Sequence, residues 1–224
     1  MRIREELERR RALADQTFPP ADLKVVEETI ERLRAAQIAE QSLRVGETLP
    51  DFALPDPSGA LVTSDELLDR GPLVLAFFRG GWCPYCPVAL EGLESVRAEI
   101  EATGASLVGV SPVRGPELQR VAEERKLGFR LLSDVDGRFS SLCGVRYKIS
   151  EQHIAFYHRV GVDLASLHDG AGWTLPLPAT YVVGQDGVIR YVFVDPDWAY
   201  RAEPEELMAA VRAYGQELGA TDGG

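Results

Sequence analysis

The feature that most constrains the fold is a wholly apolar run, residues 73–78, which ends shortly before two closely spaced cysteines, Cys83 and Cys86. A short continuous run of aliphatic and aromatic residues is typical of a strand that is buried on both faces of a parallel sheet. Pro84 and Pro87, in turn, suit the first turn of a helix. The sequence therefore predicts that the cysteine pair lies where a central strand gives way to a helix.

The same alternation of strands and helices continues along the chain. Apolar residues at spacings of three and four predict a helix directly after the cysteines. The elements expected beyond it are strands over 106–110, 129–132, 180–183 and 188–194 and helices over 116–126 and 204–218. Strands that alternate with helices pair in parallel through right-handed crossovers, and the last two strands read as a hairpin. We expect an α/β fold with a central mixed sheet flanked by helices.

The N-terminal segment, residues 1–44, differs from the rest of the chain. It is rich in charge, favours helix, and is split into two pieces by Pro19 and Pro20. The second piece carries an apolar stripe at helical spacing, which predicts packing on the body of the protein or on a second subunit in a homodimer. We expect an N-terminal helical arm, a main domain over 45–218 and a flexible tail over 219–224.

Two further segments stand out between the predicted elements. Residues 147–176 form an irregular stretch that holds all three histidines, and a long loop of this kind is usually a functional cover or a local insertion. Asp195, Asp197 and Glu203 belong to an acidic, turn-rich patch before the last helix. We expect this patch to cap that helix.

Composition excludes several classes of function. The chain has 24 Lys and Arg against 35 Asp and Glu, which gives a net charge of −11. Such a chain lacks the excess of positive charge that binding to nucleic acid or to an anionic membrane requires. No apolar run is long enough to cross a bilayer, and the N-terminus lacks the apolar stretch of a secretory signal. Three cysteines are too few for a disulfide framework. We expect a cytoplasmic protein, in which a close cysteine pair is redox-active.

The position of the two cysteines predicts reactive thiols. Ligands gather at the carboxyl ends of parallel strands, and a helix that starts there points free N–H groups and its positive dipole end at the same place. Such a setting favours the thiolate. Residues three apart in a first helical turn share a face, so one thiol can attack a substrate and the other can close a disulfide. We expect Cys83 and Cys86 to form a redox-active pair at the mouth of the sheet.

Pro84 and Pro87 both suit the first turn of a helix, so the sequence does not decide at which residue the helix begins. Either Cys83 caps a helix that begins at Pro84, or Cys86 caps a helix that begins at Pro87. The thiol nearest to the free N–H groups is the stronger nucleophile, so this boundary decides which cysteine attacks and which resolves.

A zinc site is the main structural alternative for a Cys-x-x-Cys spacing. Structural zinc is held by four ligands, but the chain has no second Cys-x-x-Cys and no histidine close to the pair in sequence. We therefore expect neither a metal nor a cofactor. Cys143 stands alone, and it is either a second resolving thiol or an inert buried side chain.

The segment around the cysteines resembles a known family. Residues 82–86, Trp-Cys-Pro-Tyr-Cys, resemble the motif of thioredoxin-like proteins, and 77–86 resembles the peroxiredoxin-like branch of the AhpC/TSA group. The resemblance extends over about 45–217. It implies a thioredoxin-like fold and a cofactor-free enzyme that reduces hydroperoxides, or another small oxidised molecule. It also implies that the pair cycles to a disulfide, which a thioredoxin or a low-molecular-weight thiol then reduces.

The chain departs from the typical peroxiredoxin pattern in three places. When the P-x-x-x-T-x-x-C segment is aligned on Cys86, its proline falls on Arg79 and its threonine on Cys83. The catalytic arginine of typical peroxiredoxins falls on Pro178. Pro178 to Thr180 instead resembles the cis-proline loop of thioredoxins, which lies beside the cysteine pair.

These departures leave two assignments open. In the thioredoxin assignment Cys83 attacks and Cys86 resolves. In the peroxiredoxin assignment Cys86 takes the peroxide oxygen as a sulfenic acid and Cys83 resolves it. The corresponding alternatives for the whole protein are a thioredoxin-type disulfide reductase and a redox-sensing interaction protein.

Several neighbours of the pair are expected to support it. Arg79 either stabilises a thiolate or a leaving oxygen, or it is an ordinary surface arginine. Trp82 is expected to pack against the pair and shield it. The remaining supporting positions are Pro84, Tyr85, Pro178 and Thr180.

Overall fold

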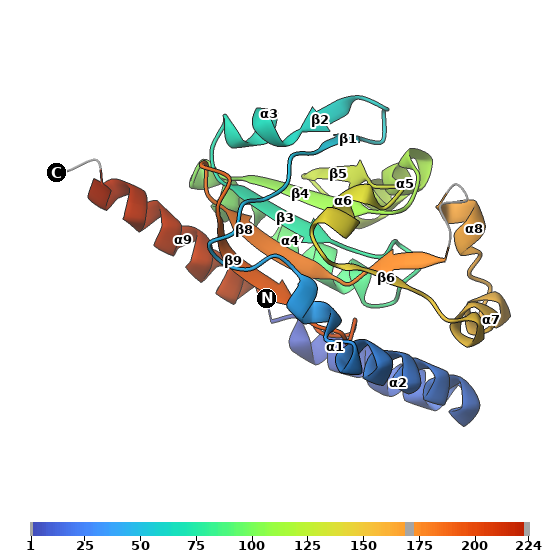
Figure 1. Cartoon of the computed structure of the whole chain (residues 1–224). Helices are drawn as coiled ribbons and strands as arrows, with labels where there is room; N and C mark the ends of the chain where they lie inside the picture. Colours follow the sequence, from blue (N-terminus) through green and yellow to red (C-terminus); the bar gives the residue numbers. More distant parts are fainter. Residues whose placement is uncertain (1, 169–172, 222–224) are drawn as a thin grey trace.

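The computed structural model describes residues 2–168 and 173–221, which are built around a five-stranded sheet (Figure 1). Its strands, in spatial order, are β5 (Arg130–Ser133), β4 (Ser106–Ser111), β3 (Leu73–Phe77), β8 (Ala179–Val183) and β9 (Ile189–Val194). The pairs β3–β4 and β4–β5 are parallel, whereas β3–β8 and β8–β9 are antiparallel. The mixed sheet expected from the sequence is therefore present, with the predicted strand β3 at its centre.

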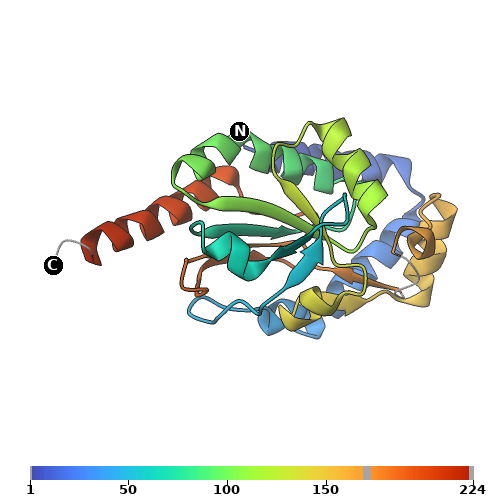
Figure 2. The same ribbon diagram turned by 90° about the horizontal axis from the view of Figure 1, so that it is seen from above.

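Helices cover both faces of the sheet. The main helices are α4 (Cys86–Ala102), α5 (Gly115–Arg125) and α9 (Pro204–Thr221). Figure 2 shows α4 and α5 along one face of the sheet and the short helix α6 (Arg138–Leu142) along the other. The predicted apolar face of α4 is buried through Leu90, Leu93, Val96 and Ile100. The smaller elements are η1 (Ile38–Gln41), β1 (Ala53–Pro55), β2 (Leu61–Thr63) and α3 (Ser64–Leu68).

The N-terminal segment forms two helices, α1 (Arg4–Thr17) and α2 (Pro20–Ala35), separated where the sequence places its two prolines. Helix α2 packs against α7 (Glu151–Arg159). Asp22 of α2 forms an ion pair with Arg159 of α7. Thr29 of α2 is hydrogen-bonded to the Nδ1 atom of His153 at 2.9 Å. The apolar stripe of α2 thus packs on the body of its own chain.

Glu203, which directly precedes α9, binds the start of α1. Its carboxylate accepts hydrogen bonds from the backbone N–H groups of Ile3 and Arg4, at 3.1 and 2.9 Å. The expectation that the acidic patch serves the last helix is therefore wrong for the Glu203 side chain, which binds α1. The free N–H groups at the start of α1 need acceptors, and a carboxylate also suits the positive end of its dipole.

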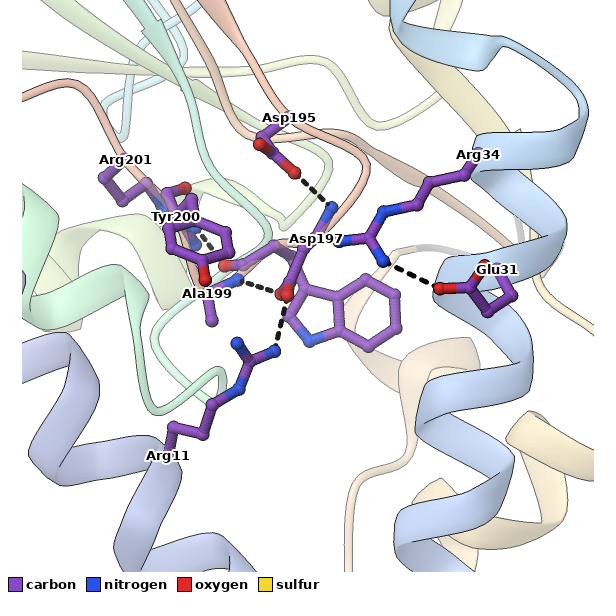
Figure 3. A network of polar contacts seen from close by, with 9 residues as sticks. Arg11, Glu31, Arg34, Asp195, Asp197, Ala199, Tyr200 and Arg201 are labelled. Atoms are coloured by element: carbon purple, nitrogen blue, oxygen red, sulfur yellow. Dashed lines mark hydrogen bonds and ion pairs between the residues drawn. The ribbon is translucent and has the colours of Figure 1, made fainter.

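A second acidic residue of the same patch binds further along α1. Figure 3 shows Arg11 of α1 reaching Asp197, which lies in the loop between β9 and α9 and forms an ion pair with it. Asp197 also accepts a hydrogen bond from the N–H of Ala199, so its carboxylate is held by the loop itself. The arm is thus joined to the loop before α9 at two points.

The stretch 147–176, of which residues 169–172 lie outside the described part of the chain, is more regular than the sequence suggested. It holds α7 and a short helix α8 (Leu164–Leu167), and its ends belong to β6 (Arg146–Lys148) and β7 (Thr174–Pro176), which pair antiparallel. Two side-chain caps explain the helices. Ser150 accepts from the N–H of His153, and Asp163 accepts from the N–H groups that begin α8. The expectation of an irregular loop is wrong because it overlooked these capping residues.

The expected domain boundaries, between residues 44 and 45 and between residues 218 and 219, remain predictions. Helix α9 runs to Thr221, which is beyond the expected start of a tail at residue 219, and residues 222–224 lie outside the described part of the chain. No helix in 2–168 or 173–221 is both long enough and apolar enough to span a membrane.

The Glu203 contact predicts how firmly the arm is held. Replacing Glu203 with alanine leaves two helix-start N–H groups without their acceptor, and we expect a loss of about 1–3 kcal/mol in the free energy of unfolding. Urea denaturation measures this loss. Glu205→Ala is the matched control, because Glu205 is exposed and reaches only the exposed Arg2 at 3.9 Å. An equal, small effect in both variants would contradict the assignment.

Candidate active site

The cysteine pair lies in the loop between β3 and α4. Helix α4 begins at Cys86, and Pro87 follows in its first turn, so the structure places the boundary near the second of the two predicted positions. Gly80 has a φ of +135°, and a Cβ there would lie 2.5 Å from the Nε1 atom of Trp82. The sharp turn before the motif therefore requires glycine.

Both thiols are completely buried. The backbone N–H of Arg79 donates to the Sγ atom of Cys86 at 3.4 Å. One guanidinium nitrogen of Arg79 lies 3.9 Å from the Sγ atom of Cys83, and one of Arg201 lies 3.6 Å from that of Cys86. Each sulfur is thus in contact with a cationic side chain.

Both arginines are buried, and none of the ion pairs within 2–168 and 173–221 joins either of them to a carboxylate. Arg79 is hydrogen-bonded to the hydroxyl of Tyr157 and lies over the rings of Trp82 and Trp198, at 5.0 and 4.5 Å from the ring centroids. Arg201 is held by backbone carbonyl groups of its own loop. The surface-arginine alternative for Arg79 is therefore wrong.

This environment shifts the pKa values of the two thiols in opposite directions. Burial raises the pKa of Cys83, but the hydrogen bond from Cys86 and the charges of Arg79 and Arg201 outweigh burial and lower that pKa well below its usual value. Burial, together with the neighbouring Cys83, raises the pKa of Cys86. The environment therefore favours the thiolate on Cys83 over a thiolate on Cys86.

The shift of Cys83 also links folding to pH. Its pKa is lower in the folded protein than in the unfolded chain, so the thiolate stabilises the fold at a pH above the unfolded pKa. That stabilisation is lost as the pH falls through the folded pKa.

A cavity of about 460 Å³ lies directly against the motif loop. Trp82, Pro84 and Tyr85 line it, whereas the two buried cysteines do not. The expectation of thiols at an open mouth of the sheet is wrong, because both sulfurs are shielded from solvent. The arm and α7 line the cavity beside the motif loop, and no local pattern could reveal their position.

Pro178 and Thr180 are the predicted supporting residues near β8. Both are buried, but the peptide bond before Pro178 is not in the expected cis form. Thr180 is buried in β8 and is paired with Ala76 of β3. Pro178 comes directly before β8 and is also buried. No peptide bond among the described residues is cis, so the cis-proline expectation is wrong. Leu177 is tied to Val145 by a backbone hydrogen bond, and the chain enters β8 without a tight turn.

Cys143 is buried at the end of α6, and its thiol is free. Burial raises its pKa well above the ordinary value. A buried, protonated thiol is typical of an inert side chain, which favours the structural alternative over a second resolving thiol.

The sequence analysis missed four residues of the site, Tyr157, His153, Trp198 and Arg201. Tyr157 and His153 were placed in an irregular stretch, and the caps of α7 are the signal that could have placed them on a helix. Trp198 and Arg201 follow β9 with no motif that marks them. His153 and His168 are buried, His158 is exposed, and the described residues contain no group of three metal-ligating side chains.

The AhpC/TSA family model matches residues 45–192. This chain belongs to the AhpC/TSA family. A putative peroxiredoxin of Mycobacterium tuberculosis is 34% identical to it over 106 residues, which cover 46% of this chain and 68% of the relative. Peroxiredoxin Bcp of Escherichia coli is 33% identical over 103 residues, with 46% of this chain and 65% of the relative covered.

Solved structures show the same fold for this AhpC/TSA member. Peroxidoxin BcpB of Mycobacterium tuberculosis superimposes with a TM-score of 0.60 at 24% identity, over 76% of this chain and 97% of that chain. Peroxiredoxin 6 of Arenicola marina gives a TM-score of 0.63 at 14% identity, over 80% of this chain and 75% of that chain. The fold is therefore thioredoxin-like, as expected. The arm and residues after 192 lie outside the match to the family.

The geometry predicts that Arg79 keeps Cys83 ionised. In Arg79→Gln we expect the pKa of the thiolate to rise by at least about one pH unit, which corresponds to about 1.4 kcal/mol. The ultraviolet absorbance of the thiolate, followed during acidification, measures the midpoint. Arg138→Gln is the matched control, because Arg138 is exposed and lies in α6. An unchanged midpoint in Arg79→Gln would show that the guanidinium does not stabilise the thiolate.

Proposed function

We propose that this chain is a thiol-dependent peroxidase in which Cys83 and Cys86 form the redox-active pair. One observation carries the proposal: two buried thiols three residues apart each lie within 4 Å of a buried guanidinium that no ion pair of the described residues joins to a carboxylate. Membership of the AhpC/TSA family and the peroxiredoxin relatives support the same activity.

The first half of the cycle consumes the peroxide. The Cys83 thiolate attacks the terminal peroxide oxygen, the O–O bond breaks, and Cys83 becomes a sulfenic acid. The other oxygen leaves with the bonding electrons and takes up a proton, which gives water from hydrogen peroxide or an alcohol from an organic hydroperoxide. Arg79, which contacts both Cys83 and the cavity, stabilises the negative charge on the leaving oxygen.

The second half restores the pair. The Cys86 sulfur attacks the sulfenic sulfur of Cys83, a disulfide forms, and water leaves. Two electrons have then passed from the pair to the peroxide. An external thiol, from a thioredoxin or a low-molecular-weight thiol, reduces the disulfide and returns the pair to its starting state. Every step uses sulfur, oxygen and protons, so the cycle needs no cofactor.

The placing of the cavity favours Cys83 as the attacking thiol. Arg79 lines the large cavity and touches Cys83, whereas Arg201 touches Cys86 and lines a different cavity beside α1. The lowered pKa of Cys83 favours the same assignment. Attack by Cys86 is the alternative order within the same overall reaction; alignment with typical peroxiredoxins implies it, and the start of α4 at Cys86 favours it by the helix-start criterion.

The burial of the cysteine pair disfavours the alternative function of a thioredoxin-type disulfide reductase. A thioredoxin-type reductase must bring an attacking thiol against a disulfide of another protein, and both sulfurs here are shielded from solvent. A small peroxide is far less bulky than a protein disulfide, and the cavity extends to Arg79, which contacts Cys83. We further propose that residues 45–218 act as the catalytic domain, that 1–44 cover it, and that the chain works in the reducing cytoplasm.

Cysteine variants test the function and the order of attack. We expect Cys83→Ser to consume hydrogen peroxide no faster than the background reaction, because the thiolate is lost. Cys86→Ser should keep the first oxidation but accumulate a sulfenic acid, which dimedone labels and mass spectrometry detects. Cys143→Ser is the control and should turn over like the wild type.

Other results of this experiment have distinct meanings. A sulfenic acid in Cys83→Ser with an inactive Cys86→Ser would reverse the order of the thiols. Full turnover in both single variants would refute the proposed function. Reduction of insulin disulfides by a wild type that peroxide does not oxidise would favour the disulfide-reductase alternative.

A further inference from the structure

The guanidinium of Arg79 has two hydrogen-bond partners within 2–168 and 173–221. One of its terminal nitrogens lies 3.9 Å from the Sγ atom of Cys83, and the other donates to the hydroxyl of Tyr157. Tyr157 is buried and belongs to α7. A single guanidinium therefore links a side chain of α7 to the sulfur that we assign as the attacking thiol.

The bond to Tyr157 sets the rotation of the guanidinium. The rings of Trp82 and Trp198 also attract it, with their centroids at 5.0 and 4.5 Å from its central carbon. That attraction acts over a range of positions up to about 6 Å from a ring centroid, whereas a hydrogen bond weakens steeply as its angle departs from a straight line. The rings therefore hold the charge, and the hydroxyl of Tyr157 determines which nitrogen faces Cys83.

Loss of this hydroxyl would leave N–H groups of a buried cation without their acceptor. Unpaired buried donors are costly, so the side chain of Arg79 would turn toward another acceptor. Arg79 lines the cavity of about 460 Å³, which is large enough for water molecules that can accept its hydrogen bonds. A turn in that direction takes the nitrogen beside Cys83 away from the sulfur, and the thiolate then loses part of its stabilisation.

A second buried tyrosine lies near Arg79 but is not bonded to it. Tyr147 belongs to β6, and its hydroxyl has no hydrogen-bond partner among the described residues. Burial raises the pKa of Tyr147 and the charge of Arg79 opposes that shift, so the two groups lie close enough to interact. Tyr147 and Tyr157 thus place the same hydroxyl in one neighbourhood, and only Tyr157 holds Arg79. Tyr147 is therefore a matched control for a change at Tyr157.

The arm holds the helix that carries Tyr157. Arg159, two residues after Tyr157, forms an ion pair with Asp22 of α2. The ring of His153, four residues before it, packs on the Tyr157 ring with 4.5 Å between the ring centroids, and its Nδ1 atom is hydrogen-bonded to Thr29 of α2. Residues four apart lie on the same face of a helix. Contacts with the arm on both sides of Tyr157 therefore fix the position of its hydroxyl.

We propose that Tyr157 is a positioning residue: its hydroxyl holds Arg79 against Cys83, and the arm keeps Tyr157 in place through α7. The inference rests on the proposed function, in which the Cys83 thiolate attacks the peroxide. Tyr157 acts through Arg79 and does not itself have to touch the substrate. Because Arg79 stabilises first the thiolate and then the leaving oxygen, Tyr157 supports both the ionisation of Cys83 and the rate of attack.

Tyr157→Phe tests this role, because it removes the hydroxyl and keeps the ring that packs against Trp82 and His153. We expect the midpoint of the thiolate absorbance on acidification to rise by about half a pH unit. The rate constant for oxidation of Cys83 by hydrogen peroxide, measured by stopped flow above both midpoints, should fall about tenfold, the size of one hydrogen bond to a charged group. Tyr147→Phe should leave both values unchanged.

A double variant shows whether Tyr157 acts through Arg79. The side chains that act on the pKa of Cys83 are those of Cys86, Arg79 and Arg201, and Tyr157 is hydrogen-bonded to Arg79 alone among them. In Arg79→Gln there is no guanidinium to hold, so adding Tyr157→Phe should change neither the midpoint nor the rate further. Effects of the two substitutions that add in full would contradict the proposal.

Thr29→Val tests the part played by the arm. It removes the hydroxyl that contacts His153 and keeps a branched side chain of similar size. We expect a smaller rise of the midpoint than in Tyr157→Phe, because α7 loses only one of its contacts with α2. Thr17→Val is the matched control, since Thr17 is exposed and its hydroxyl is bonded within α1, to the carbonyl of Leu13. An unchanged midpoint in Thr29→Val would refute the part assigned to the arm.

These outcomes separate the inference from the function on which it rests. An unchanged or lower midpoint in Tyr157→Phe overturns the inference, as does an equal rise in Tyr147→Phe, and the peroxidase function stands if hydrogen peroxide still oxidises the wild type. If hydrogen peroxide does not oxidise the wild type but Tyr157→Phe raises the midpoint, the proposed function fails and the positioning role remains. Circular dichroism reports whether each variant is folded. If Tyr157→Phe is not, the midpoint in Thr29→Val decides.

Discussion

The site depends on the burial of the Arg79 guanidinium against Cys83 without a carboxylate. Burying a charge costs several kcal/mol, and aromatic faces of the kind that surround Arg79 return about 0.5–2 kcal/mol. The remaining compensation has to come from an anion, and the Cys83 thiolate is the one in contact. In the proposed cycle this anion vanishes when the disulfide forms, while Arg79 and Arg201 stay buried and charged. The reduced pair is therefore favoured, and the disulfide is readily reduced by an external thiol.

The part of this site that local patterns encode could be predicted from the sequence. The apolar run gave the central strand, and the periodic apolar residues after Cys86 gave helix α4, because burial on two faces and burial on one face leave different spacings. The residues that surround the pair from elsewhere could not be predicted. Arg201 lies 115 positions from Cys86 and has no neighbouring motif, so only the fold brings the two together.

The arm shows the same division between local and long-range information. Two prolines and an apolar stripe predicted two helices, and both are present. Where the helices lie is set by Glu203, which binds residues about 200 positions away, and by pairs such as Asp22 with Arg159. No spacing within the arm encodes these contacts. For that reason the thiols were expected at the mouth of the sheet, although both are buried beside a cavity that the arm helps to line.

A covered site changes how the thiolate can react. Excluding water strengthens the interaction of Arg79 with the thiolate and later with the leaving oxygen, because both act in a medium of low dielectric. It also requires a path by which product leaves. The arm is attached through ion pairs whose carboxylates, on Asp197 and Asp22, are only 4% and 12% exposed, and through the hydrogen bonds that Glu203 accepts. Breaking these contacts would leave the hydrogen bonds of the sheet intact, so movement of the arm disrupts less of the fold than opening the sheet would.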